Sequence, residues 1–199
     1  PEGLRNKVFE MIEPSVENRA SRNHAEKKRI AQNAVARIKP KSTIAIDVGT
    51  TCFELASLLS DNSVRVISSS LPIQTHLANQ QMLIYAPCGR IAGADPSTVG
   101  AQTVAYLRNF NFEIAFLAVA GITEEGLFDY SFEDAEIKKT LIAQAQTRIL
   151  MVDHSKIGTS SAVRVAGFDS IDVLITDQPL SPEMAEILAD SRVEVVVAI

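Results

Sequence analysis

The sequence contains little of what marks a secreted, metal-binding or membrane-spanning protein. Only two of its 199 residues are cysteines, and Cys52 and Cys88 lie far apart and outside any CxxC spacing, so neither a disulfide framework nor a zinc site is expected. No apolar run approaches the ~20 residues of a membrane span, and no signal peptide opens the chain. We therefore expect a cytoplasmic protein with no membrane contact, no metal and no redox cofactor.

Basic residues are scarce after the first 41 positions. Residues 1–41 contain ten Lys/Arg and five Asp/Glu (+5), whereas residues 42–199 contain nine and nineteen (−10), which together give the net charge of −5. The acidic main part disfavours binding to nucleic acid. Lys27, Lys28 and Arg29 stand beside Glu26 in a helix predicted over residues 22–38. This pattern is more typical of a solvated helix face than of a DNA contact.

Short apolar runs alternate with helical patterns along the chain. The hydrophobic content of 46% is enough for a sizeable core in one α/β domain. Continuously apolar strands that alternate with helices predict a mostly parallel, Rossmann-like sheet with helices on both faces. The first 20 residues show no clear period, so we expect a linker or extension there and one domain over residues 21–199. The predicted strands cover residues 44–46, 64–67, 82–85, 114–119, 148–152, 173–176 and 193–198.

One strand–turn–helix stretch predicts the centre of a site. The first predicted strand ends at Asp47, and Gly49, Thr50 and Thr51 form a small, hydroxyl-rich turn before a helical pattern. Thr51 and Glu54 have the spacing of a capping box. A helix N-terminus at such a turn offers free N–H groups and a partial positive charge, which suit an anion and most often a phosphate. An ordinary capped turn has the same pattern, so this stretch alone leaves both interpretations open.

Polar and small residues at the ends of other predicted strands favour the anion site. The carboxyl ends of parallel strands lie at one edge of the sheet, and ligands of such sheets bind there. The residues that reach this edge, besides Asp47, are Ser69, Ser70, Gly121, Asp153 and Lys156.

A helix predicted from Ser131 to about Thr147 adds a lysine. Lys138 and Asp134 fall within the apolar arc of this helix. An inward-facing Asp/Lys pair at i, i+4 is unfavourable unless both charges find partners. Two interpretations stay open: a pair at the edge of the core whose lysine reaches water, or a lysine that points into the strand-end crevice to meet an anion.

A series of short motifs stands in a characteristic order along residues 26–199. The motifs comprise residues 26–31, 47–51, 69–72, 89–90, 100, 115–122, 134–139, 153–156 and 172–177. In this order and spacing the chain resembles the C-terminal effector-sensing domain of DeoR-type bacterial transcriptional regulators. The resemblance implies a fold similar to ribose-5-phosphate isomerase and to the NagB-like and CoA-transferase-like folds. It also implies a phosphorylated sugar or related metabolite as effector, and an N-terminal helix-turn-helix domain that is absent from this chain.

The resemblance and the strand-end pattern together give each site residue an expected role. Asp47 would accept sugar hydroxyls, the turn after it would hold the phosphate, and Gly121 would permit close approach. Ser69, Cys88 and His154 stand where the family usually carries Asn, Gly and Ser, which puts the polar contacts to the sugar in doubt. The expected ligand-binding residues are Asp47, Gly49, Thr50, Thr51, Ser69, Ser70, Gly89, Gly121, Asp134, Lys138, Asp153 and Lys156.

An enzyme on the same fold, a sugar-phosphate isomerase or a deaminase-like protein, is the alternative. The acidic run Asp-Gly-Ala-Asp-Glu that is typical of ribose-5-phosphate isomerase is absent, although Asp134, Glu136 and Asp153 remain candidate general bases. We therefore expect the sensor domain of a repressor of sugar metabolism. It would form a homo-oligomer (dimer or tetramer) and meet DNA only through the missing helix-turn-helix domain.

Overall fold

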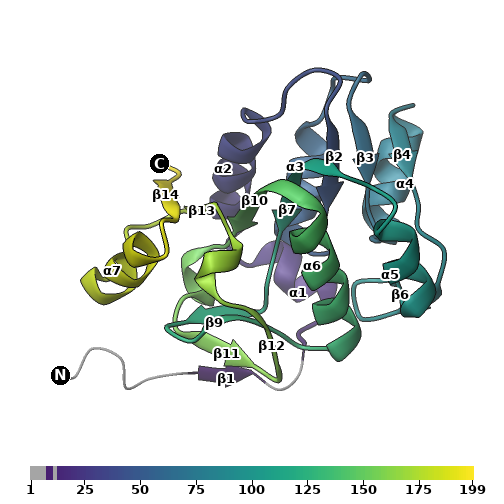
Figure 1. The fold of residues 1–199 in the computed structure, drawn as a ribbon. Helices are drawn as coiled ribbons and strands as arrows, with labels where there is room; N and C mark the ends of the chain where they lie inside the picture. Colours follow the sequence, from purple (N-terminus) through teal and green to yellow (C-terminus); the bar gives the residue numbers. More distant parts are fainter. Residues whose placement is uncertain (1–7, 11–12) are drawn as a thin grey trace.

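A seven-stranded parallel sheet forms the centre of the protein, as predicted (Figure 1). The structure is a computed structural model that describes residues 8–10 and 13–199. All seven predicted strands lie in this sheet, in the spatial order β14-β13-β10-β7-β2-β3-β4. The strands are β2 (Thr43–Ile46), β3 (Arg65–Ile67), β4 (Leu83–Tyr85), β7 (Phe112–Leu117), β10 (Ala145–Met151), β13 (Val173–Thr176) and β14 (Glu194–Val197).

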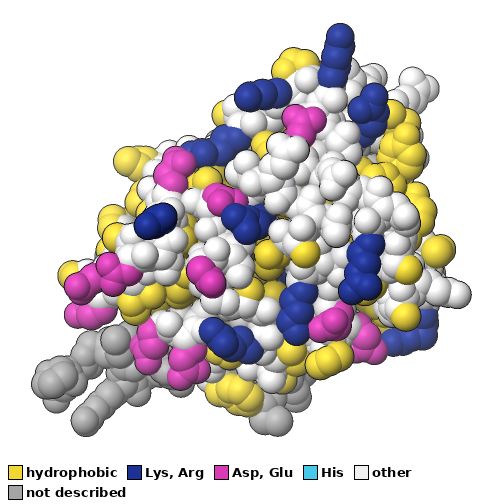
Figure 2. All heavy atoms as spheres, viewed as in Figure 1, with side chains coloured by type: hydrophobic (Ala, Val, Ile, Leu, Met, Phe, Trp, Pro, Cys, Tyr) yellow, Lys and Arg dark blue, Asp and Glu magenta, His cyan; other side chains and the backbone are white. Residues whose placement is uncertain are grey.

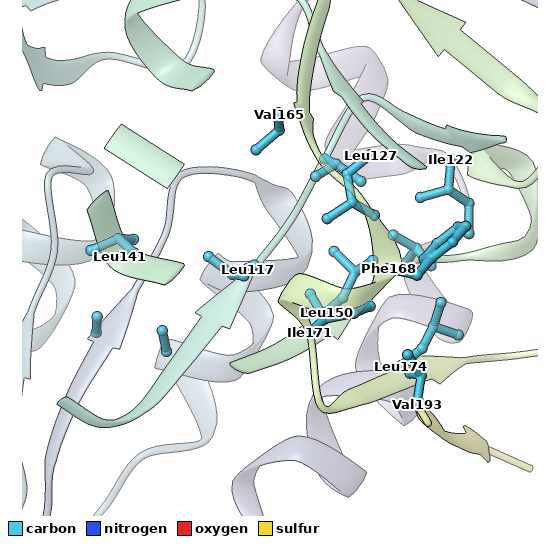
Figure 3. Close-up of a cluster of buried hydrophobic side chains, with 14 of the residues drawn as sticks. Leu117, Ile122, Leu127, Leu141, Leu150, Val165, Phe168, Ile171, Leu174 and Val193 are labelled. Atoms are coloured by element: carbon cyan, nitrogen blue, oxygen red, sulfur yellow. The ribbon is translucent and has the colours of Figure 1, made fainter. Parts of the chain in front are cut away.

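Helices cover both faces of the sheet, because alternate strand residues point to opposite sides. In β10, Ile149 packs with the helices of one face and Leu150 with those of the other. The first face carries α2 (His24–Val35), α3 (Thr50–Leu58) and α4 (Leu71–Asn79). The second carries α5 (Ala101–Leu107), α6 (Phe132–Gln144) and α7 (Pro182–Asp190), and Figure 3 shows part of its core.

Serine side chains start three of these helices. Ser70, Ser131 and Ser181 accept hydrogen bonds from the backbone N–H groups of Ile73, Asp134 and Met184. These bonds satisfy donors that have no partner within the helix. The predicted start of α6 at Ser131 is therefore confirmed, whereas the helix ends at Gln144 rather than near Thr147, because β10 begins at Ala145.

The capping box predicted for α3 is wrong. The N-cap is Gly49, which has φ +133° and no side-chain acceptor, and Thr50 and Thr51 already belong to the helix. Glu54 does not reach back to the helix start but lies 3.2 Å from Nε2 of His24 in α2. The first-turn N–H groups of α3 thus keep no side-chain cap.

Shorter elements, which the sequence pattern did not predict, complete the fold. A three-stranded antiparallel sheet has the order β12-β9-β8, β5 pairs with β6, and β1 runs parallel to β11. Within the described part of the chain, no helix is long and apolar enough to cross a membrane. The elements are β1 (Val8–Glu10), α1 (Val16–Ser21), β5 (Arg90–Ala92), β6 (Ser97–Val99), β8 (Gly121–Thr123), β9 (Gly126–Asp129), η1 (His154–Lys156), β11 (Thr159–Ser161), β12 (Val163–Ala166) and η2 (Phe168–Ser170).

The surface carries no large block of one charge on the face seen in Figure 2. Lys/Arg and Asp/Glu side chains are interspersed there. A mixed face of this kind lacks the basic stripe that proteins use to follow the phosphates of DNA.

Candidate functional site

A cavity of about 140 Å³ lies at the carboxyl ends of β2, β7 and β10. Its floor is formed by the residues that follow these strands: 48–50 after β2, 118–120 after β7, and 152–153 after β10. The chain places β3 and β4 on one side of β2, and β7, β10, β13 and β14 on the other. The cavity therefore lies where the strand order reverses, the place at which open α/β sheets bind ligands.

Two further walls close the cavity. One comes from the first helical segment and includes Asn18, Arg19 and Arg22, together with Glu13 and Pro14 before it. The other comes from the end of β9 and from α6. Figure 1 shows α1 at the same end of the sheet as β9 and β12. The second wall consists of Asp129, Tyr130, Asp134 and Lys138.

Seven of the expected ligand-binding residues line this cavity. Three of them, Gly49, Thr50 and Thr51, lie at the uncapped start of α3. The strand–turn–helix stretch that the sequence pattern singled out therefore does reach the cavity. Thr51 is buried, whereas Thr50 is partly exposed. The other four are Asp134, Lys138, Asp153 and Lys156.

Lys138 makes two ion pairs at the bottom of the cavity. Its Nζ lies 2.8 Å from Oδ2 of Asp47 and 3.0 Å from Oδ2 of Asp129. Lys138, Asp47 and Asp129 are only 4%, 1% and 6% exposed. The interpretation of Lys138 as an exposed partner of Asp134 is wrong, because Asp134 instead accepts a hydrogen bond from the Ser131 hydroxyl at 2.5 Å. The ammonium carries three N–H groups and faces two carboxylates, so one N–H group can serve a ligand.

Asp47 supports the cavity without lining it. Its Oδ2 accepts a hydrogen bond from the backbone N–H of Ala118 at 3.2 Å, which ties the end of β2 to the end of β7. The expected direct contact of Asp47 with sugar hydroxyls therefore has no counterpart in the cavity lining, whose carboxylates are those of Glu13, Asp129, Asp134 and Asp153.

Burial and neighbouring charges shift the pKa values of Asp47 and Lys138. Burial raises the pKa of Asp47 to about 6, and the neighbouring charge of Lys138 only partly opposes this. Burial alone would lower the pKa of Lys138, but Asp129 and Asp47 together hold it well above its usual value. Lys138 is thus a permanent cation, and Asp47 takes up a proton in mildly acidic solution.

The raised pKa of Asp47 predicts a pH-dependent stability. This carboxyl binds its proton more readily in the folded protein than in the unfolded chain, so it favours folding at low pH and loses that effect as the pH rises through about 6. Asp47→Asn removes this dependence. We expect the difference in free energy of unfolding, Asp47→Asn minus wild type, to be about 2 kcal/mol more positive at about pH 7.5 than at about pH 4.5. Urea titrations at the two pH values measure this difference.

The exposed Asp190 in α7 supplies a matched control for this measurement. Asp190→Asn makes the same chemical change away from the cavity and should track the wild type at both pH values. A stability difference between Asp47→Asn and the wild type that does not change with pH would contradict the prediction.

Asp153 is held by hydrogen bonds from its surroundings. Its Oδ1 accepts from Asn23 Nδ2 at 2.7 Å, from the Ser155 hydroxyl at 2.5 Å and from the Ser155 backbone N–H at 3.0 Å. Burial would raise the pKa of Asp153, but these bonds outweigh it and lower the pKa. Asp153 therefore stays ionised at the edge of the cavity and connects it to the α1–α2 junction.

Besides Asp47, four expected residues do not line the cavity. Ser69 and Ser70 are buried, and Ser70 caps α4. A Cβ on Gly121 would lie 2.2 Å from the backbone oxygen of Thr159, so the close approach that this glycine permits is to β11 rather than to a ligand. A Cβ on Gly89 would meet the Thr103 hydroxyl, which donates to the backbone oxygen of Cys88. These positions shape the fold around the site.

The sequence pattern missed two groups of cavity residues. Asp129 ends a short strand that shows no clear alternation, and only its place in the fold brings it to Lys138. The residues of α1 show no apolar periodicity in the sequence, because none of the side chains of this helix is buried. Among residues 8–10 and 13–199, no group of three or more His, Cys, Asp or Glu side chains is placed to hold a metal ion.

A family model and several curated proteins match this chain. The model described as "DeoR C terminal sensor domain" matches residues 22–178. The chain is 27% identical over 172 residues to the glycerol-3-phosphate regulon repressor of Escherichia coli (strain K12), covering 85% of this chain and 68% of that protein. It is 28% identical over 173 residues to the HTH-type transcriptional repressor GlcR of Bacillus subtilis (strain 168), covering 86% and 67%.

Solved structures confirm the predicted fold. Ribose 5-phosphate isomerase A from Methanocaldococcus jannaschii matches with a TM-score of 0.50 at 17% identity, covering 68% of this chain and 55% of that one. The eIF2B beta subunit from Chaetomium thermophilum matches with a TM-score of 0.51 at 12% identity, covering 84% and 54%. The chain thus spans about half the length of these solved chains, and at such low identity the similarity concerns the fold alone.

Proposed function

Because the chain belongs to the DeoR C-terminal sensor domain family, we propose that it binds a phosphorylated sugar or a related metabolite in the cavity at the strand ends. Sensor domains of this family bind small effector metabolites, and they belong to transcriptional repressors of sugar metabolism rather than to enzymes. The effector would change DNA binding by a helix-turn-helix domain that precedes this domain in a longer protein, acting in the cytoplasm as a homo-oligomer.

The observation that carries the proposal is the uncapped start of α3 inside the cavity. Gly49 places no side chain over the first turn, and Thr50 and Thr51, which begin the helix, line the cavity. A phosphate satisfies several such donors at once and meets the positive end of the helix dipole. Lys156, which also lines the cavity, adds positive charge.

The opposite side of the cavity suits the neutral part of a sugar. Asp129 and Asp134 present carboxylates, which accept hydrogen bonds from hydroxyl groups. The third N–H of Lys138 can donate to a sugar oxygen between them. A molecule with an anionic group at one end and several hydroxyls at the other therefore matches the cavity. The name of the Escherichia coli relative, a glycerol-3-phosphate regulon repressor, is consistent with an effector of this class.

A nuclear magnetic resonance titration tests where the phosphate binds. Sugar phosphates should shift the backbone amide signals of Thr50, Thr51 and Cys52 most strongly, because these N–H groups begin α3. The start of α5 is a matched control: Gly100 also gives it no side-chain cap, but it does not line the cavity. Unmoved α3 signals, or equal shifts at Gln102 and Thr103, would place the phosphate elsewhere.

A further inference from the structure

Polar contacts hold the α1 wall of the cavity in place. None of the side chains of α1 is buried. Arg19 lies 2.7 Å from Oε1 of Glu13, and Lys27 donates to the last carbonyl groups of the segment, those of Arg19 and Arg22. The junction with α2 is fastened by Asn23, which donates to Asp153. Contacts of this kind can be strengthened or weakened by a charge placed among them.

Four cations gather at this side of the cavity. Burial lowers the pKa of Lys27, the charge of Asp153 opposes this, and the charges of Lys156, Arg19 and Arg22 lower the pKa further, which places these three cations within electrostatic reach of Lys27. All four line the cavity. Their mutual repulsion is unfavourable in the empty cavity and would be relieved by an anion.

Arg22 is the cation of this group that is open to a ligand. The guanidinium of Arg19 pairs with Glu13, and the ammonium of Lys27 is engaged by backbone carbonyls. Arg22 is exposed, and within the described chain its guanidinium has no hydrogen-bond or ion-pair partner. Arg22 is also the C-cap residue of α1, so a ligand that binds its side chain fixes the end of that helix.

We propose that Arg22 binds the anionic group of the effector together with the start of α3, and so fastens α1 over the occupied cavity. The inference rests on the proposed function, since it assigns a further contact to the same ligand. The two elements lie close enough for this, because α1 contacts α3 directly. A guanidinium binds phosphate through two parallel hydrogen bonds, which gives the contact both strength and direction. Arg22 thereby selects effectors that carry the phosphate.

Replacing Arg22 by glutamine tests this contact. Calorimetric titrations first compare the binding of glycerol 3-phosphate, ribose 5-phosphate and fructose 6-phosphate to the wild-type protein. The compound that binds most tightly is the ligand for the comparison. Arg22→Gln should raise its Kd about 10- to 100-fold. It should leave the melting temperature of the free protein nearly unchanged, because the side chain is exposed and makes no hydrogen bond or ion pair within the described residues. Ligand should also slow amide hydrogen exchange in residues 16–22 of the wild type but not of the variant.

Lys28→Gln is the matched control, since Lys28 is exposed, lies nearby in α2 and does not line the cavity. It makes the same change in charge and should keep the wild-type Kd and exchange pattern. Equal affinity of Arg22→Gln and wild type, or equal losses in both variants, would overturn the role of Arg22 while leaving the proposed function intact. Failure of the wild type to bind any member of the panel would refute the proposed function itself.

Discussion

Lys138→Met is expected to lower the free energy of unfolding by about 3–5 kcal/mol, because it leaves two buried carboxylates without their cation. Asp47 and Asp129 lie 2.8 Å and 3.0 Å from the ammonium and are almost inaccessible to water. Methionine fills the space of the lysine stem, so the loss reports charge rather than packing. Urea denaturation at about pH 7.5 measures it.

Two comparisons isolate this effect. Lys139→Met changes the next residue, whose pair with Glu136 is exposed to solvent, and should alter stability by less than about 0.5 kcal/mol. Adding Asp47→Asn and Asp129→Asn to Lys138→Met removes the stranded charges and should restore most of the loss. If Lys138→Met were as mild as Lys139→Met, the buried ion pairs would have no part in holding the site together.

The central sheet could be predicted from the sequence because its strands are buried on both faces. Runs such as residues 114–119 and 173–176 are continuously apolar, and only a parallel sheet covered by helices on both sides buries them fully. The position of the cavity followed from the same pattern, since parallel strands bring the ends of β2, β7 and β10 to one edge. Ser131 and Ser181 marked helix starts through a local hydrogen bond that depends on few other residues.

The partners of the charged residues could not be predicted, because they depend on contacts between distant elements. Lys138 and Asp134 have helical spacing, yet Lys138 pairs with Asp47 and Asp129 from two other strand ends. The capping spacing of Thr51 and Glu54 was misleading for a similar reason, since His24 of α2 supplies a partner for Glu54. Gly121 did signal a close approach, but the sequence does not say to which atom, and the structure gives Thr159.

Helix α1 shows the limit of pattern-based prediction most clearly. Its residues form part of the cavity wall, but no side chain of the helix is buried, so no apolar period marks it in the sequence. The predicted helix over residues 22–38 instead begins at His24, after Asn23 takes a left-handed conformation with φ 55°. That turn allows α1 to fold back over the cavity and places Asn23 beside Asp153.

A cognate sugar phosphate is expected to stabilise the fold by about 2.7 kcal/mol when present at about 100 times its Kd. For a domain of this size this corresponds to a rise in melting temperature of roughly 5–10 °C. The phosphate supplies most of the gain, because the start of α3 and the surrounding cations have little to bind in an uncharged sugar. The free sugar keeps only the hydroxyl contacts to the opposite wall.

The most direct test of the account is therefore a paired thermal-shift measurement on the wild-type protein. Glycerol 3-phosphate, ribose 5-phosphate and fructose 6-phosphate are each compared with their unphosphorylated parents at equal concentration, with inorganic phosphate as the control for the anion alone. We predict that at least one phosphorylated compound raises the melting temperature by several degrees more than its parent and more than inorganic phosphate. Equal shifts from a phosphorylated compound and its parent, or no shift from any of the phosphorylated compounds, would contradict the account.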